Sequence, residues 1–243
     1  MNSSLSVWER LLMLPQVLAT TPMLAIAMTM LAFFAANRLY ILIGRPVWLP
    51  PVVPAATLLA GMIALLGLEA ATFREGADWL MLLLGPATVA LGVPLYQNIH
   101  HIRALLWPII ITLPIAASLA VMYTLVIAWA LDASPTVMLS LAPKSVTAAI
   151  ALAIGDTIGS SVPLLMAALL ITGVFTTFCV ELATRLLKIT DERVIGFALG
   201  LNGHAIGTVR AFEISATAGA FSSLGMSLTG LFTALFLPIM FRL

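Results

Sequence analysis

Charged residues are scarce in this chain. Only 9% of its 243 residues are Asp, Glu, Lys or Arg, whereas 62% are hydrophobic. Soluble domains carry about 25% charged residues, because they need them at the surface that faces water. The shortage excludes a soluble globular protein. A formal net charge of +1 and the lack of a basic cluster also exclude a nucleic-acid-binding surface.

Cysteine is nearly absent as well. The single cysteine, Cys179, lies in an apolar run, which excludes a disulfide framework or a CxxC metal site within one chain. The HExxH, GxSxG, P-loop and dinucleotide-binding patterns are also missing. The sequence therefore predicts a protein that is not an enzyme and that binds no metal ion and no cofactor.

Long apolar runs dominate what remains, and a membrane helix needs about 20 such residues. Strands of a membrane barrel would instead alternate polar and apolar residues. We predict an all-α, polytopic integral membrane protein of about seven or eight hydrophobic segments. It is expected to form a single domain over residues 1–243, with an N-terminal interfacial segment at 1–18. The predicted segments are 19–36, 47–68, 79–97, 105–131, 137–158, 163–184, 194–213 and 218–241.

The flanking charges predict both the membrane and the topology. The first residues lack the basic region of a secretory signal, so we expect a multi-pass protein of a bacterial inner (plasma) membrane. The positive-inside rule places Arg38 and Arg103 in the cytoplasm and the acidic stretch 69–78 outside. The basic loop 185–193 would then lie outside if segment 137–158 crossed fully. The conflict disappears if 137–158 enters and turns back as a re-entrant hairpin.

Three apolar segments contain glycine or proline and are poor straight helices: 82–96, 140–159 and 195–213. Interrupted hydrophobic segments are the best sequence pointer to the binding site of a transporter. Two of these segments also hold ionisable side chains. We therefore expect discontinuous helices that are broken near Pro143 and near Gly203–Gly207, with the two breaks facing each other.

The second of these segments begins like a half-helix. Proline fits the first helical turn, so Pro143 is predicted to start a helix whose free amides lie beside Lys144, Ser145 and Thr147. Amides, an ammonium and hydroxyls together suit a small carboxylate. Further donors are predicted from the third segment, so that the candidate substrate-binding residues are Lys144, Ser145, Thr147, Asn202, His204, Thr208 and Arg210.

Each charged member of this set also has a plainer interpretation. Lys144 lies near a span end and could extend toward the membrane interface. Arg210 is one helical turn from Glu213 and could pair with it. His204 could be a core histidine that bonds a carbonyl. If His204 instead faces the substrate, its ordinary pKa of about 6.5 would let it couple uptake to protons.

Four stretches resemble the LrgB/CidB family. Residues 143–151 resemble the signature PKSVTxPIA, and residues 203–211 resemble the motif HxxGTARA. Residues 219–224 resemble GAFSSL, and residues 85–96 resemble GPATVALAxPLY. The matches fall in order from about residue 40 to the end of the chain. Ala149 and Val209 depart from the usual proline and alanine.

The resemblance implies two kinds of function. Bacterial members are described as holin-like or antiholin-like modulators of murein hydrolase export and autolysis, acting beside a small LrgA/CidA-type membrane partner. Plant relatives resemble plastidal glycolate/glycerate translocators, and some bacterial members are assigned to pyruvate uptake. Charged groups inside broken helices favour a transporter of small monocarboxylates of the pyruvate, glycolate, glycerate and lactate class. The antiholin-like role is the alternative, and homo-oligomer formation is left open.

Overall fold

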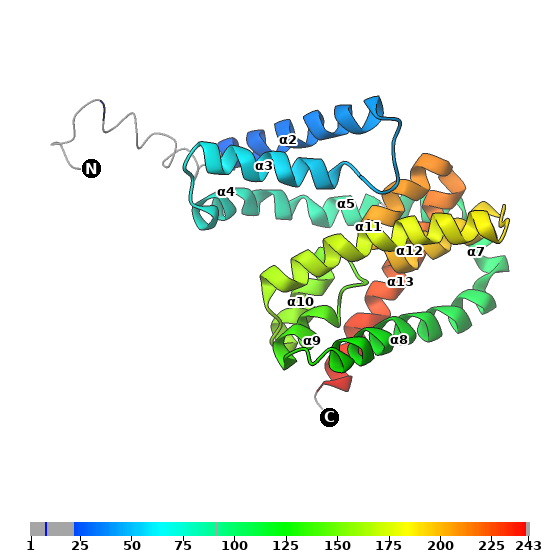
Figure 1. Cartoon of the computed structure of the whole chain (residues 1–243). Helices are drawn as coiled ribbons and strands as arrows, with labels where there is room; N and C mark the ends of the chain where they lie inside the picture. Colours follow the sequence, from blue (N-terminus) through cyan, green and yellow to red (C-terminus); the bar gives the residue numbers. More distant parts are fainter. Residues whose placement is uncertain (1–7, 9–21, 91, 242–243) are drawn as a thin grey trace. The chain divides into compact units, whose positions relative to one another are not determined.

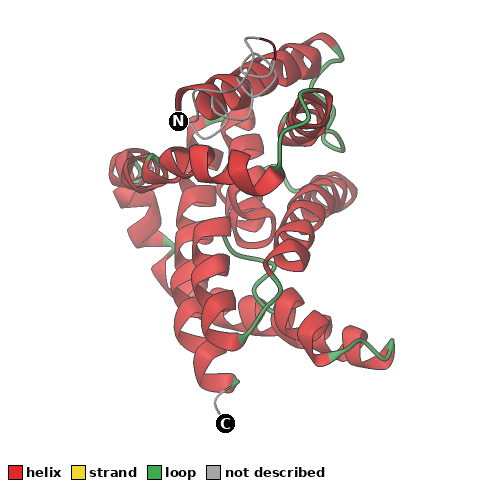
Figure 2. Ribbon diagram, turned by 90° about the vertical axis from the view of Figure 1, so that its left-hand side faces the viewer, coloured by secondary structure: helices red, strands yellow, loops and turns green. Residues whose placement is uncertain are grey.

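The computed structural model describes residues 8, 22–90 and 92–241, so the interfacial segment predicted at 1–18 lies outside the described residues except for Trp8. Helices are the only regular secondary structure in the described part of the chain (Figure 2). The all-α prediction is confirmed. From residue 105 onward the helix bounds follow the predicted hydrophobic segments closely, whereas the helices Pro22–Leu42 and Ala70–Leu82 extend beyond the segments predicted at 19–36 and 79–97.

The chain forms two compact units, Met1–Val89 and Ala90–Leu243. In the first unit, α2 packs against α3 and α4 (Figure 1), with Ala25, Met28, Leu68 and Phe73 at the centre of its core. The helices that begin in this unit are α2 (Pro22–Leu42), α3 (Val52–Leu65), α4 (Ala70–Leu82) and α5 (Leu84–Ala90).

The second unit contains the remaining helices. The predicted segment 79–97 is interrupted at Leu83, between α4 and α5, which confirms that it is discontinuous. The helices of the second unit are α6 (Gly92–Gln97), α7 (Ile99–Ala104), α8 (Leu106–Ala130), α9 (Pro135–Leu141), α10 (Ala148–Ile158), α11 (Val162–Leu186), α12 (Glu192–Ile214) and α13 (Ala216–Met240).

Within the described residues, four helices are long and apolar enough to cross a membrane. They are α2, α8, α11 and α13, with 21 or 25 residues each. Many of their large apolar side chains are exposed, as expected of helices that face lipid. The hydrophobic segments between α8 and α11 and between α11 and α13 instead fold back on themselves.

The first of these segments, which we name hairpin 1, consists of α9, the non-helical residues 142–147 and α10. The hydroxyl of Ser160 donates to the carbonyl of Leu139 at 2.9 Å, and the amide of Ser161 donates to the hydroxyl of Ser140 at 2.8 Å. The chain thus returns beside α9 after α10. The left-handed Gly159, with φ of 79°, ends α10 at this base. The prediction that this segment turns back as a hairpin is confirmed.

The second segment, α12, is also a hairpin, which we name hairpin 2. Its backbone reverses at His204, where φ is 40° and ψ is −129°. A Cβ atom added to Gly207 would collide with the carbonyl of Leu199, eight residues earlier, which is impossible in a straight helix. At the base, the hydroxyl of Ser215 donates to the carboxylate of Glu192 at 2.6 Å. The break predicted at 203–207 is confirmed.

Close backbone contacts hold hairpin 2 against the neighbouring span. Cβ atoms added to Gly196 and Gly200 would collide with the backbones of Ala218 and Ser222 in α13. Figure 1 shows α12 lying against α11 and α13. Only glycine allows helices to approach this closely, which explains why this segment is rich in it.

The two hairpins lie at opposite ends of α11. Hairpin 1 precedes the first residue of α11, whereas hairpin 2 follows the last turn of α11. The 25 residues of α11 span about 37 Å, which exceeds the hydrocarbon thickness. In this arrangement the basic loop 185–193 lies on the same side as Arg103, which agrees with the positive-inside rule.

Candidate functional site

The inner ends of the two hairpins meet at Leu169, in the middle part of α11. The side chain of Leu169 packs in one buried cluster with Ala142 and Val146 from the turn of hairpin 1. Its carbonyl oxygen lies 3.1 Å from Nε2 of His204, at the turn of hairpin 2. The two predicted breaks therefore lie close together in the protein interior, as the sequence predicted.

Lys144 lies in the turn of hairpin 1 and is half-buried. Its ammonium nitrogen lies 3.4 Å from the hydroxyl oxygens of Tyr123 and Ser145, and 5.0 Å from the ring centroid of Tyr123. No carboxylate among the described residues forms an ion pair with it. Lys144 is thus a cation held by neutral groups, with its charge available to an anion.

The helix that follows Lys144 begins later than predicted. Pro143 lies in the non-helical turn, and α10 begins at Ala148 with Thr147 as its N-cap, so the prediction that Pro143 starts the half-helix is wrong. The backbone of Thr147 is extended, and its side chain makes no capping hydrogen bond. The first-turn amides of α10 consequently have no acceptor within the helix, and they lie at the inner end of hairpin 1.

His204 is buried and conformationally strained. Its positive φ of 40° is unfavourable for a residue with a Cβ atom. Because a carbonyl can only accept, Nε2 must carry the proton that bonds Leu169, which leaves Nδ1 as the nitrogen that can gain or lose one. The ammonium of Lys144 is close enough for its charge to act on this ring.

Gly173 makes room for the histidine ring. A Cβ atom at this position would lie 2.7 Å from Cε1 and 2.9 Å from Nε2 of His204. The interpretation of His204 as a core histidine bonded to a carbonyl is correct for Nε2. This interpretation concerns Nε2 alone and assigns no role to Nδ1.

Asn202 and Thr208 flank His204 and are held within the protein. The amide nitrogen of Asn202 donates to the carbonyl of Ala198 at 2.9 Å, and the backbone carbonyl of Asn202 accepts from the hydroxyl of Thr176. The hydroxyl of Thr208 donates to the carbonyl of His204 at 2.8 Å and lies 2.9 Å from the hydroxyl of Ser222. These residues shape the turn of hairpin 2.

Arg210 takes part in an ion-pair network. Its guanidinium bonds the carboxylate of Glu181 in α11 and, at 2.7 Å, that of Glu213 one turn later. Arg185, whose side chain is 76% exposed, adds a second cation to Glu181 at 3.2 Å. The pairing with Glu213 considered from the sequence is confirmed. The two carboxylates compete with any substrate for this guanidinium.

Sequence reasoning missed two partners of the candidate residues. Tyr123 lies in α8, 21 positions before Lys144, and Glu181 lies 29 positions before Arg210. A carboxylate inside an apolar segment was a usable signal for Glu181, since a buried charge requires a partner. No local pattern marked Tyr123, because a tyrosine in a membrane helix is common.

An ion pair also caps the outer end of hairpin 2. The carboxylate of Asp191 accepts from the amide of Arg193 at 2.9 Å and from its guanidinium at 2.6 Å. These bonds lower the pKa of Asp191 to about 2, with the side-chain hydrogen bond from Arg193 as the largest cause. Both side chains are 38% exposed, so the contribution of this pair to stability is small.

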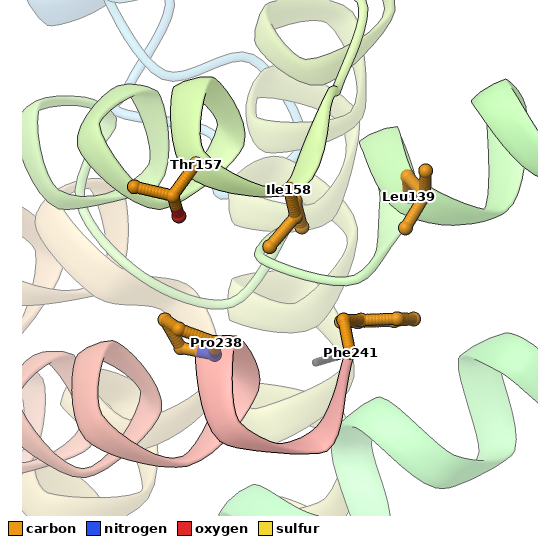
Figure 3. A pocket seen from close by; sticks show the side chains of 5 residues that line it. All are labelled: Leu139, Thr157, Ile158, Pro238 and Phe241. Atoms are coloured by element: carbon orange, nitrogen blue, oxygen red, sulfur yellow. The ribbon is translucent and has the colours of Figure 1, made fainter. Parts of the chain in front are cut away.

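A pocket of about 210 Å³ lies at the outer end of hairpin 1 rather than at its turn. Figure 3 shows its five lining side chains, which come from α9, α10 and the end of α13. None of the predicted site residues lines it. In the described part of the chain, no three His, Cys, Asp or Glu side chains gather as metal ligands. The pocket lining is Leu139, Thr157, Ile158, Pro238 and Phe241.

Two opposed helical hairpins among long apolar helices are the features of a multi-pass membrane protein with polar groups in its interior. The chain belongs to the LrgB-like family, which it matches over residues 29–243. The resemblance noted in the sequence is therefore confirmed.

Several bacterial relatives cover most of this chain. It is 28% identical to the uncharacterised protein YwbG of Bacillus subtilis over 88% of its own length and 94% of the relative. It is 25% identical to the holin-like protein CidB of Staphylococcus aureus (91% and 96%), and 27% identical to the antiholin-like protein LrgB of Bacillus cereus (69% and 74%). No solved structure matches the chain.

Proposed function

We propose that this protein transports small monocarboxylates of the pyruvate, glycolate, glycerate and lactate class across a bacterial inner membrane. The observation that carries the proposal is the half-buried Lys144, which has no carboxylate partner among the described residues and precedes the free amides of α10. A cation and a helix N-terminus together attract a small anion. The protein acts by binding and releasing its substrate, without covalent chemistry.

Two hairpins at opposite ends of α11 also suit alternating access. Transporter sites lie near the middle of the membrane, between helix ends that the surrounding spans keep out of lipid. In this protein the turns of both hairpins meet at Leu169 and lie in the interior. A small movement of either hairpin would expose the site to one side of the membrane while the other hairpin keeps it closed.

His204 supplies the link to protons in this proposal. Protonation at Nδ1 would add a second positive charge near Lys144 and strengthen the attraction for a carboxylate. Uptake would then be favoured at lower external pH. A small LrgA/CidA-type membrane protein is proposed as the partner, because that pairing accompanies the family resemblance.

The names of two relatives favour a second candidate. Proteins called holin-like and antiholin-like match this chain, so a role as an antiholin-like modulator of murein hydrolase export, without its own transport, is the alternative. Such a role needs neither an unpaired lysine nor a strained histidine at the meeting point of two hairpins. Effects on autolysis could also follow indirectly from the movement of overflow acids.

Uptake into vesicles separates the two candidates. Purified protein is reconstituted into liposomes, alone or with a co-expressed LrgA-type partner, and uptake of radiolabelled pyruvate, glycolate and lactate is measured. Saturable uptake of one of these acids is the expected result. Equal counts in protein-free and protein-containing vesicles, with and without the partner, would leave the antiholin-like role as the better candidate.

A further inference from the structure

One face of α13 contacts both hairpins. Ser222, Met226, Thr229 and Leu237 recur at helical spacing, and all four are buried. The hydroxyl of Ser222 and the sulfur of Met226 lie 2.9 and 3.6 Å from Oγ1 of Thr208 in hairpin 2. Leu237 packs in the cluster that contains the turn of hairpin 1. This face therefore runs from one hairpin to the other.

Thr229 lies where the contacts change from one hairpin to the other. Met226, one turn earlier, contacts hairpin 2. The next residue, Gly230, contacts hairpin 1, because a Cβ atom there would lie 2.5 Å from Cδ1 of Ile150. Ile150 belongs to the first turn of α10, whose amides have no acceptor within that helix. Thr229 thus immediately precedes a residue that contacts the first turn of α10.

The hydroxyl of Thr229 has no hydrogen-bond partner among the described residues, although the side chain is 1% exposed. Three other buried threonines behave differently: the hydroxyls of Thr124, Thr177 and Thr208 all donate to the carbonyl four residues earlier. Buried polar groups are nearly always bonded, and an exception in a native protein calls for a ligand or a functional reason.

We propose that Thr229 is a further substrate-binding residue, whose hydroxyl donates a hydrogen bond to an oxygen of the bound monocarboxylate. This inference rests on the proposed transport function and adds a third element, α13, to a site formed by the two hairpins. A carboxylate only accepts hydrogen bonds, so it complements the Thr229 hydroxyl, the α10 amides and the Lys144 ammonium.

The test compares Thr229→Val with Thr124→Val in the same vesicles, using radiolabelled pyruvate and glycolate. Valine matches threonine in shape and removes only the hydroxyl. Thr229→Val is expected to raise the KM for uptake about tenfold or more, since the lost bond involves a charged acceptor. Its melting temperature should equal or exceed that of the wild type. Thr124→Val is the control and should keep the wild-type KM.

Two further variants keep the test decisive if Thr229→Val does not fold. Thr229→Ser retains the hydroxyl and Thr229→Ala lacks it, so only the alanine variant should show the raised KM. A wild-type KM in Thr229→Val, or equal KM values for the serine and alanine variants, overturns the inference while wild-type uptake persists. Absence of uptake by the wild type overturns the proposed function and this inference with it.

Discussion

Hairpin 1 and hairpin 2 lie at opposite ends of α11 in the same unit, yet they are stabilised in different ways. Hairpin 1 turns through six non-helical residues, 142–147, and its base is closed by the neutral hydroxyls of Ser140 and Ser160. Hairpin 2 reverses at a single residue, His204, and ion pairs stabilise its outer part.

The difference indicates that the two hairpins have different roles. Among the described residues, hairpin 1 presents groups without strong partners, namely the Lys144 ammonium and the first amides of α10. Hairpin 2 is instead bonded to its neighbours, through the ion pair of Arg210 with Glu181 in α11 and through the packing of Gly196 and Gly200 against the backbone of α13. A hairpin fixed by its neighbours opposite an unsatisfied one is a suitable arrangement for holding a small anion, because the fixed partner sets the geometry.

The largest effect is expected from Arg210→Met. This change removes from hairpin 2 the cation that contacts both Glu181 in α11 and Glu213. Breaking a buried ion pair typically costs about 3–5 kcal/mol, because the remaining charges stay uncompensated. The free energy of unfolding, measured in detergent by tryptophan fluorescence against denaturant, should fall by an amount in this range. The exposed partner provides the control: Arg185→Met should cost less than about 1 kcal/mol.

This prediction also tests whether Arg210 binds substrate. If Arg210→Met is as stable as the wild type but loses carboxylate uptake, Arg210 belongs to the binding site as the sequence predicted. In that case the contrast between the two hairpins would have to be abandoned.

Lys144→Gln should have the next largest effect and should act on binding alone. The change removes a charge-assisted contact of about 1.5–3 kcal/mol, which corresponds to about 10- to 150-fold in substrate affinity. The apparent KM for uptake into vesicles measures it. Lys144→Arg retains the charge and serves as the control. Normal uptake by a well-folded Lys144→Gln protein would mean that Lys144 only extends toward the membrane interface.

His204→Gln is expected to change the pH profile rather than the fold. The glutamine amide can still donate to the carbonyl of Leu169, but it cannot gain a proton. Uptake by the wild type should rise as external pH falls, and the variant should flatten this dependence. Because the pH gradient itself also drives transport of the acid, both proteins must be compared at the same pH gradient. An unchanged profile would remove His204 from proton coupling and leave Lys144 in the site.

The smallest effect is expected from Asp191→Ala at the outer end of hairpin 2. The folded-state pKa of about 2 lies below the ordinary value of about 3.8, so Asp191 stabilises the fold above about pH 4. This contribution is lost as the pH falls from about 4 through about 2. Given the exposure of the pair, the loss at pH 7 should stay below about 1 kcal/mol.

Melting curves of Asp191→Ala and the wild type at pH 7 and pH 3 provide the measurement. The difference between the two proteins should be larger at pH 7. A difference that grows on acidification would show that Asp191 contributes through something other than its ionised carboxylate. Among the described residues no such ion pair lies at the base of hairpin 1, so Ser160→Ala should show no pH dependence of this kind.

The sequence by itself determined the helical class, the membrane spans and the places where the helices break. These features follow from local composition: apolar runs of sufficient length span the membrane, and Pro143, Gly159 and Gly203 mark interruptions. The charge on loop 185–193 favoured a hairpin at 137–158 over a full crossing, because the positive-inside rule is a property of loops and needs no contact information.

Only the tertiary structure decided which polar groups pair. The partners of Lys144 and Arg210 come from helices more than 20 positions away, and no local pattern links such positions. That α10 begins at Ala148 rather than at Pro143 also depended on packing, because Val146 packs in the buried cluster that contains Leu169. The hydroxyl of Thr229, which has no partner among the described residues, could not be predicted from the sequence, because burial and hydrogen bonding are properties of the fold.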